Sequence, residues 1–135
     1  MRKQQVLALL LVTAFMLTAC QNGLLSDGQH PADKIVLHQM ESFGQVKENS
    51  RFEVTDDQTI ELFAESISRA DKVAGVADVA DPDFKVEFGD KALYLWIAEG
   101  HGSVMDVEDT YTLYTLEEKD ADRIHTFLSS ENLLD

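Results

Sequence analysis

The sequence predicts an α+β fold, in which an antiparallel sheet of about five to six short strands carries two helices on one face. Alternating apolar and polar residues at 84–88 indicate a strand, and Gly89-Asp90 is typical of the two-residue turn that joins it to a second strand at 91–98. Apolar residues recur at helical spacing over 55–70 and again after Glu118. Short turns favour antiparallel pairing, so the helices would cover one face of the sheet.

Two more strands are predicted near the start of the folded part. Residues 34–40 are rich in β-forming side chains, and Phe52 and Val54 alternate with charged residues. A loop over 41–50 would join these strands. His38 lies in the first of them and is expected to be a half-buried structural residue.

Capping patterns mark the two helices. Thr55-Asp56-Asp57-Gln58 is a capping box, which predicts a first helix that begins after Thr55 and ends near Ala70. Thr115-Leu116-Glu117-Glu118 repeats the pattern before the second helix, where His125 is expected to be a structural residue near the C-terminus. The residues expected to face the core are Ile60, Phe63, Ala64 and Ile67 in the first helix and Ala121, Ile124 and Leu128 in the second.

The strand at 91–98 has two apolar faces and belongs to a predicted meander of four strands. The meander continues through a short strand at 104–105, an acidic loop at 106–109 and a strand at 110–115. One face of 91–98 carries Leu93, Leu95 and Ile97, and the other carries Ala92, Tyr94 and Trp96.

The aromatic residues of the meander have two interpretations. Tyr94 and Trp96, together with Tyr111 and Tyr114, are expected to lie in the core beneath the helices. The alternative is that these four residues are exposed together, with Tyr94 and Trp96 as the surface that binds a partner.

The N-terminus has the parts of a secretory signal. Arg2 and Lys3 precede an uncharged apolar run over 6–17. That run is too short for a membrane-spanning helix, which needs about 20 apolar residues.

The end of this signal, Leu17-Thr18-Ala19-Cys20, resembles the lipobox of bacterial lipoproteins. The resemblance implies a diacylglyceryl group on the Cys20 thiol and cleavage between Ala19 and Cys20. An ordinary cut after Ala19 would place Leu17 third from the end, where a small residue is preferred. Two acyl chains hold a protein firmly on a membrane, so Cys20 would be an anchor.

Three segments are therefore expected: a signal peptide at 1–19, a lipidated cysteine with a flexible tether at 20–33, and a single domain at 34–135. Removal of 1–19 takes away two basic residues and no acid, which changes the formal net charge from −14 to −16. The expected location is the outer face of the cell membrane, with the acidic body standing off anionic lipid headgroups.

Composition excludes several classes of function. A net charge of −14 argues against binding to nucleic acid, whose phosphates require clustered lysine and arginine. One cysteine excludes an intramolecular disulfide framework and a multi-cysteine metal site. The chain contains no phosphate-binding loop, nucleophile elbow or paired-histidine zinc motif. We therefore expect neither an enzyme nor a cofactor other than the lipid.

Acidic clusters are the candidate binding residues. Asp106, Glu108 and Asp109, with His101 nearby in sequence, could gather oxygen ligands around a divalent cation. The acids of 78–83 form a second such cluster. Neither matches the twelve-residue EF-hand pattern.

Two stretches, Asp81-Pro82-Asp83-Phe84-Lys85-Val86 and residues 102–116 (GSVMDVEDTYTLYTL), are similar to the YhfM-like lipoproteins. These are uncharacterised proteins of Bacillus-type bacteria. The resemblance covers the lipobox and roughly residues 35–128, and it implies a surface lipoprotein without implying an activity.

The expected function is that of a non-enzymatic, membrane-tethered interaction or regulatory domain. Its partner would be an envelope protein or a basic ligand. The alternative is a lipoprotein that binds a divalent cation or a small ligand at its acidic loops, and a hydrolase that uses two carboxylates is a further alternative.

The lipobox generates the first prediction. Mass spectrometry of the processed protein is expected to show Cys20 as the first residue, with a diacylglyceryl group on its sulfur. Cys20→Ser is expected to release the protein from the membrane fraction, because it removes the only thiol. An unmodified thiol, or a different first residue, would contradict the lipoprotein interpretation.

Overall fold

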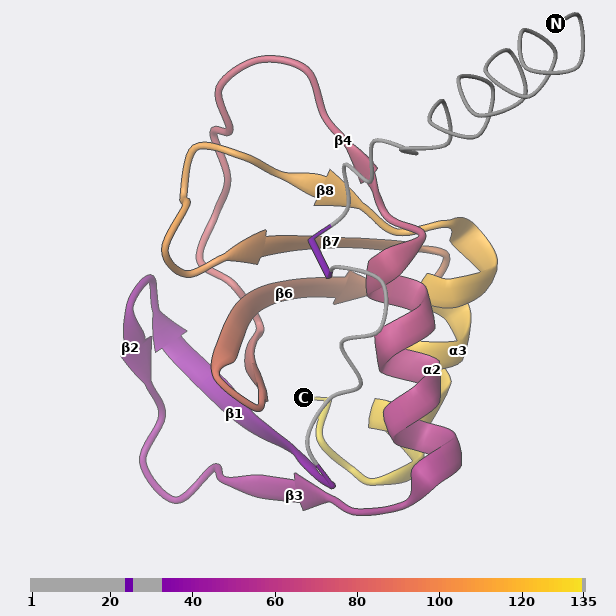
Figure 1. Ribbon diagram of the computed structural model, residues 1–135. Coiled ribbons are helices and arrows are strands. Elements are labelled where there is room, and N and C mark those ends of the chain that lie inside the picture. The colour runs from indigo at the N-terminus through magenta and orange to yellow at the C-terminus, as the bar shows by residue number, and fades with distance from the viewer. Residues whose placement is uncertain (1–23, 26–32, 135) are drawn as a thin grey trace, which may run out of the picture.

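The computed structural model describes residues 24–25 and 33–134 (Figure 1). The predicted signal peptide, Cys20 and most of the predicted tether lie outside these residues. The strands are β1 (Ile35–Ser42), β2 (Gln45–Val46), β3 (Phe52–Val54), β4 (Asp71–Lys72), β5 (Phe84–Phe88), β6 (Lys91–Ala98), β7 (His101–Asp106) and β8 (Tyr114–Thr115). The helices are α2 (Asp57–Ser68) and α3 (Glu118–Ser130). Neither of these helices is long and apolar enough to cross a bilayer.

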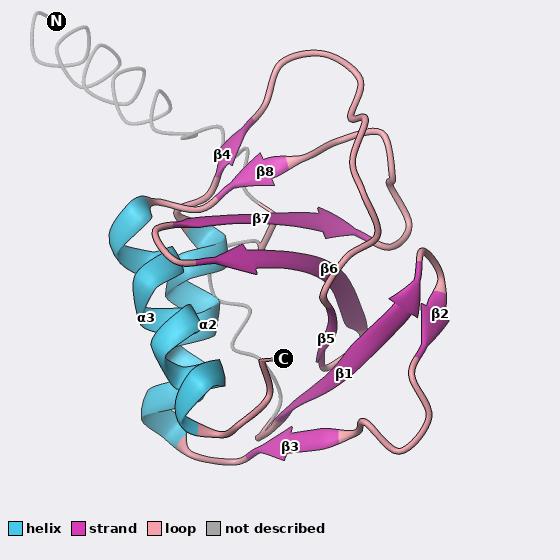
Figure 2. Ribbon diagram, turned by 180° about the vertical axis from the view of Figure 1, so that it is seen from behind, coloured by secondary structure: helices cyan, strands magenta, loops and turns pink. Residues whose placement is uncertain are grey.

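The strands form one antiparallel sheet in the order β2-β1-β5-β6-β7-β8-β4, and β3 also pairs with β1. One edge of β1 pairs with β5, while β3 and β2 share the other edge. Both helices lie on the same side of the sheet (Figures 1 and 2). The structure thus confirms the predicted α+β class and the hairpin formed by β5 and β6.

The sheet has eight strands, which is more than expected. The additional strands, β2 and β4, have two residues each. Such short segments have no periodicity to detect, and β4 exists only because β8 lies beside it, pairing Asp71 with Thr115. β7 is longer than predicted because the turn before it needs only Glu99 and Gly100, and Gly100 adopts a φ of 72° that favours glycine.

Both predicted helix caps are wrong by one or two positions. Asp56, not Thr55, caps α2, and its carboxylate accepts hydrogen bonds from the Thr59 amide at 3.0 Å and the Thr59 hydroxyl at 2.8 Å. α3 begins after Glu117 without a side-chain cap. Thr115 is unavailable as a cap because it belongs to β8.

The core lies between the helices and one face of the sheet. Six of the seven helix residues predicted to face the core are buried there: Ile60, Phe63, Ile67, Ala121, Ile124 and Leu128. The seventh, Ala64, is half-buried. From β6, Leu93 and Leu95 point into the same core. His38 is half-buried as expected, with its Nε2 3.7 Å from a Glu87 carboxylate oxygen.

A buried ion pair joins the two helices. Asp120 in the first turn of α3 is completely buried, and its two carboxylate oxygens accept hydrogen bonds from Arg69 Nε at 3.0 Å and Nη2 at 2.7 Å. The Arg69 guanidinium lowers the pKa of Asp120, and the carboxylate raises the pKa of Arg69. Arg69 follows the last residue of α2, so the pair fixes the end of one helix to the start of the other.

The ion pair generates the second prediction. Because the folded state lowers the pKa of Asp120, the pair stabilises the fold above the unfolded pKa of about 3.9, and this contribution is lost as pH falls through the lower folded pKa. Asp120→Asn is expected to reduce the free energy of unfolding at pH 7 by about 3 kcal/mol, the lower end for a broken buried pair, since Arg69 can still reach water. The difference from wild type should shrink in urea titrations below about pH 4.

Glu65→Gln is the matched control, because Glu65 is an exposed partner of Arg69 at 3.6 Å. We expect it to change stability by less than about 0.5 kcal/mol. A constant difference between Asp120→Asn and wild type from pH 7 to pH 3 would contradict the assignment.

Candidate functional site

Three aromatic side chains gather on the sheet face that the helices leave uncovered. Residues of β6 alternate, so Tyr94 and Trp96 point away from the core that contains Leu93 and Leu95. Phe43, in the turn between β1 and β2, lies against both, with ring centroids 5.0 Å from Tyr94 and 6.1 Å from Trp96. We call Phe43, Tyr94 and Trp96 the aromatic surface.

The expectation that Tyr94 and Trp96 lie in the core beneath the helices is wrong. Both are half-buried, and Phe43 is 40% exposed. The physical reason is that only one face of β6 can meet the helices, and its leucines occupy that face. Sequence reasoning missed Phe43 because it lies in a turn far from β6 in the chain.

The other two tyrosines do not join this surface. Tyr111 lies in the turn before β8 and is 74% exposed. Tyr114 in β8 is half-buried against the core. The predicted strand at 110–115 is reduced to Tyr114–Thr115, which separates Tyr111 from the sheet.

The segment before β5 holds the aromatic surface in place. Trp96 Nε1 donates to the Ala80 carbonyl at 2.9 Å, and the Phe43 amide donates to Asp81 Oδ1 at 2.8 Å. Asp83 accepts from the Ile97 amide at 2.8 Å, and its own amide donates to the Leu95 carbonyl. Figure 2 shows this connection from β4 descending past β6 to β5. Asp81 and Asp83 thus cap main-chain amides where strand pairing ends.

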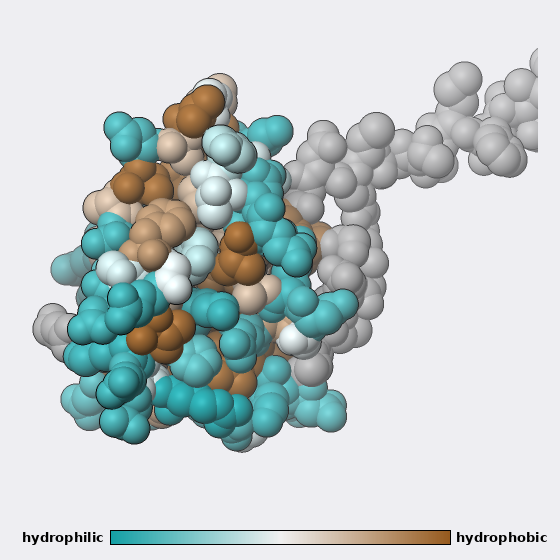
Figure 3. Space-filling view, turned by 90° about the vertical axis from the view of Figure 1, so that its left-hand side faces the viewer, coloured by the Kyte–Doolittle hydropathy of each residue, from teal (hydrophilic) through white to brown (hydrophobic). Residues whose placement is uncertain are grey.

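Charged residues of both signs lie near the aromatic surface. Glu41, Asp78 and Asp81 are exposed on the same strand end and connection that carry Phe43 and Ala80, and Lys85 of β5 is the cross-strand partner of Tyr94. Figure 3, which looks at the side where β2 lies, shows hydrophobic side chains in patches bordered by hydrophilic ones. The aromatic rings therefore have a carboxylate, Asp81, at Phe43 and a lysine, Lys85, opposite Tyr94.

The acidic loop at 106–109 is held by its own carboxylates. Asp106 accepts from the Glu108 amide at 2.9 Å and lies 3.2 Å from Lys91 Nζ, and Asp109 accepts from the Tyr111 amide at 3.2 Å. His101 is at the opposite end of β7 from Asp106, so the structure does not bring it to this loop. In the described ranges, no three histidine, cysteine or acidic side chains are placed to hold a metal ion. Cation binding by Asp106, Glu108 and Asp109 stays a prediction.

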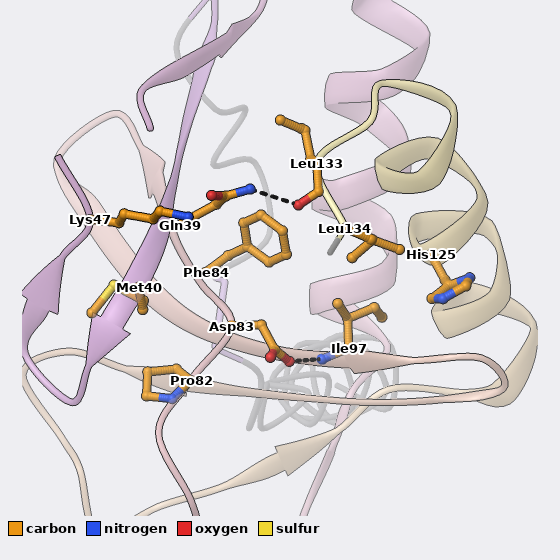
Figure 4. A pocket seen from close by; sticks show the side chains of 10 residues that line it. All are labelled: Gln39, Met40, Lys47, Pro82, Asp83, Phe84, Ile97, His125, Leu133 and Leu134. Atoms are coloured by element: carbon orange, nitrogen blue, oxygen red, sulfur yellow. Dashed lines mark hydrogen bonds between the residues drawn. The ribbon is translucent and has the colours of Figure 1, made fainter. Parts of the chain in front are cut away.

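An open cavity of about 320 Å³ lies between β1 and the end of α3 (Figure 4). His125 lines it beside apolar residues such as Phe84 and Leu134. Two of its polar groups already have partners, because Gln39 Nε2 donates to the Leu133 carbonyl at 2.8 Å and Asp83 binds the Ile97 amide. The cavity therefore ranks below the aromatic surface as a candidate site.

The capping role of Asp83 generates the third prediction. Asp83→Ala removes the acceptor of the Ile97 amide, and we expect the free energy of unfolding to fall by about 1–2 kcal/mol. Trp96 is the single tryptophan of the chain. Its fluorescence should shift to longer wavelength as the segment that carries Ala80 loosens. Asp78→Ala, an exposed acid in the same connection, should change neither property, and equal effects of the two substitutions would contradict the role.

Comparison with known proteins adds the family. The YhfM protein family matches residues 29–133, which include both of the stretches that showed the resemblance. No curated protein and no solved structure matches the chain. Residues of those stretches have structural roles here: Asp81, Asp83 and Asp106 cap amides, and a Cβ on Gly102 would lie only 2.8 Å from Leu116 Cδ1. The match spans most of the sequence, and the chain belongs to the YhfM family.

Proposed function

We propose that this protein is a lipid-anchored, non-enzymatic interaction domain at the outer face of the cell membrane, and that its aromatic surface binds a basic segment of a partner protein. One observation carries the proposal: Phe43 from the turn between β1 and β2 meets Tyr94 and Trp96 of β6 on the sheet face that α2 and α3 leave open. The lipobox-like sequence at 17–20 supports the anchor.

The aromatic surface has the composition of a protein-binding site. Tyrosine, tryptophan and phenylalanine are enriched at protein interfaces, where they contribute large contact areas. The hydrogen bonds of Trp96 to Ala80 and of Phe43 to Asp81 hold the rings before any partner arrives. Such preorganisation lowers the entropy lost on binding.

Charge supports a basic partner. Lysine and arginine cations are attracted to the faces of tryptophan and tyrosine rings. Glu41, Asp78 and Asp81 lie on the segments that border these rings, so a basic segment would meet carboxylates and aromatic rings together. The formal net charge of −16 that remains after removal of residues 1–19 would also steer a basic partner toward the protein.

The acidic residues support a role other than catalysis. Asp81, Asp83, Asp106 and Asp109 each accept a hydrogen bond from a main-chain amide, and Asp120 is buried against Arg69. A catalytic carboxylate must instead exchange protons with a substrate. Proton exchange by these carboxylates would break the hydrogen bonds and the ion pair that they make within the fold.

The fourth prediction tests the binding surface. A photo-crosslinking amino acid at Phe43 in living cells should capture a partner that mass spectrometry identifies, whereas the same label at Tyr111 should not. For the purified partner, Phe43→Ala and Trp96→Ala are expected to weaken binding at least about tenfold, as truncation of interface hot spots does. The dissociation constant should also rise with salt concentration.

Tyr111→Ala is the matched control, because Tyr111 is an exposed tyrosine outside the surface. Phe43 lies outside β6, so Phe43→Ala removes a ring of the surface without substituting a residue of the central strand, and thermal unfolding of this variant separates lost binding from lost folding. Unchanged affinity in both surface variants, or equal crosslinking from position 111, would overturn the proposal.

A further inference from the structure

Leu24 is built into the core although it lies in the segment that the sequence predicts to be a tether. It is only 7% exposed and belongs to the cluster that contains Phe63, Leu93 and Ile124, and Leu25 packs against that cluster. The Leu24 carbonyl accepts a hydrogen bond of 2.6 Å from Lys91 Nζ. Apolar and polar contacts therefore both attach this short segment to the domain.

The position of Leu24 limits how far the domain can lie from Cys20. Leu24 lies four positions after Cys20, and a fully extended chain over four positions spans at most about 14 Å. A free tether over the thirteen residues 21–33 would have a typical span of roughly 20 Å and a much longer maximum. With Leu24 bound, the domain cannot stand further from an anchor at Cys20 than the short span allows.

The position of Leu24 also selects the side that faces the anchor. Leu24 lies among the core residues on the helix-covered face of the sheet, whereas Tyr94 and Trp96 point from the opposite face. A short connection from Leu24 to the bilayer would keep the helix-covered face near the bilayer. The face that carries Tyr94 and Trp96 would then point away from the bilayer.

We infer that Leu24 and Leu25 form a strap that holds the helix-covered side of the domain toward the lipid bilayer and presents the aromatic surface outward. This inference rests on the lipid anchor of the proposed function. The partner of the strapped side is a lipid surface, and the partner of the aromatic surface is a protein. The strap thus deepens the proposed function by giving the binding surface a defined direction.

The experiment uses the chain that begins at Cys20, coupled through its thiol to a maleimide lipid in nanodiscs that contain spin-labelled headgroups. Paramagnetic broadening of amide signals is expected to be several-fold stronger around Leu24 and Lys91 than around Phe43 and Trp96. In L24D/L25D the strap is released, so the ratio between the two regions should fall toward one. Equal broadening of both regions in the wild-type chain, or stronger broadening at the aromatic surface, would overturn the inference.

Q21D/N22D is the matched control, because it adds the same charge to the segment without changing either leucine. It should keep the wild-type ratio. In solution, without lipid, L24D/L25D should lower the midpoint of thermal unfolding relative to Q21D/N22D, and equal midpoints would show that the strap is not bound. Chemical coupling to the maleimide lipid tests the strap separately from the natural lipid anchor. An unmodified Cys20 in cells would refute the anchor, whereas the orientation measured in nanodiscs would still support the strap.

Discussion

Both described helices, α2 and α3, pack on the same face of the sheet, and the other features of the fold are arranged around this one-sided packing. β6 is apolar on both faces, so its leucines enter the core while Tyr94 and Trp96 are left on the other side. Within residues 24–25 and 33–134, no helix covers that second face, and the connection that carries Ala80, Asp81 and Asp83 binds its edges instead. An antiparallel sheet tolerates such an arrangement because one of its faces can meet water. The candidate binding surface is a consequence of this unequal covering.

The acidic composition has a structural explanation as well as an electrostatic one. Many acids accept hydrogen bonds from main-chain amides: Asp56 begins α2, Asp81 and Asp83 close the ends of strand pairing, and Asp106 shapes a loop. A carboxylate that accepts from an amide satisfies a donor that strand or helix pairing leaves free. Of these acids, Asp81 also lies at the aromatic surface, where it accepts from the Phe43 amide. In the proposed function, Asp81 would serve both local folding and the attraction of a basic partner.

The predictable part of the fold was the part with local signals. The β5–β6 hairpin follows from alternation and a two-residue turn, and the buried faces of α2 and α3 follow from helical spacing. The helix caps were less predictable. Thr115 was expected to cap α3, but it pairs with Ser103 in the sheet as part of β8. β4 carries no local signal and depends on β8, which lies more than forty residues away in the chain. Of the candidate site, Tyr94 and Trp96 could be named from alternation, but Phe43 could not.

The sequence by itself determined the element types, the family resemblance, the acidic character and a lipobox-like end to the N-terminal apolar run. These properties depend on residue types and on residues that are close together in the chain, and both can be read directly from the sequence. Only the tertiary structure decided which face of β6 the helices cover, that Arg69 meets Asp120, and that Leu24 enters the core. Each of these depends on contacts between residues far apart in the chain. Composition and periodicity do not say which distant residue each side chain contacts, because many residues of the same type are available. The tertiary fold determines which of them come together.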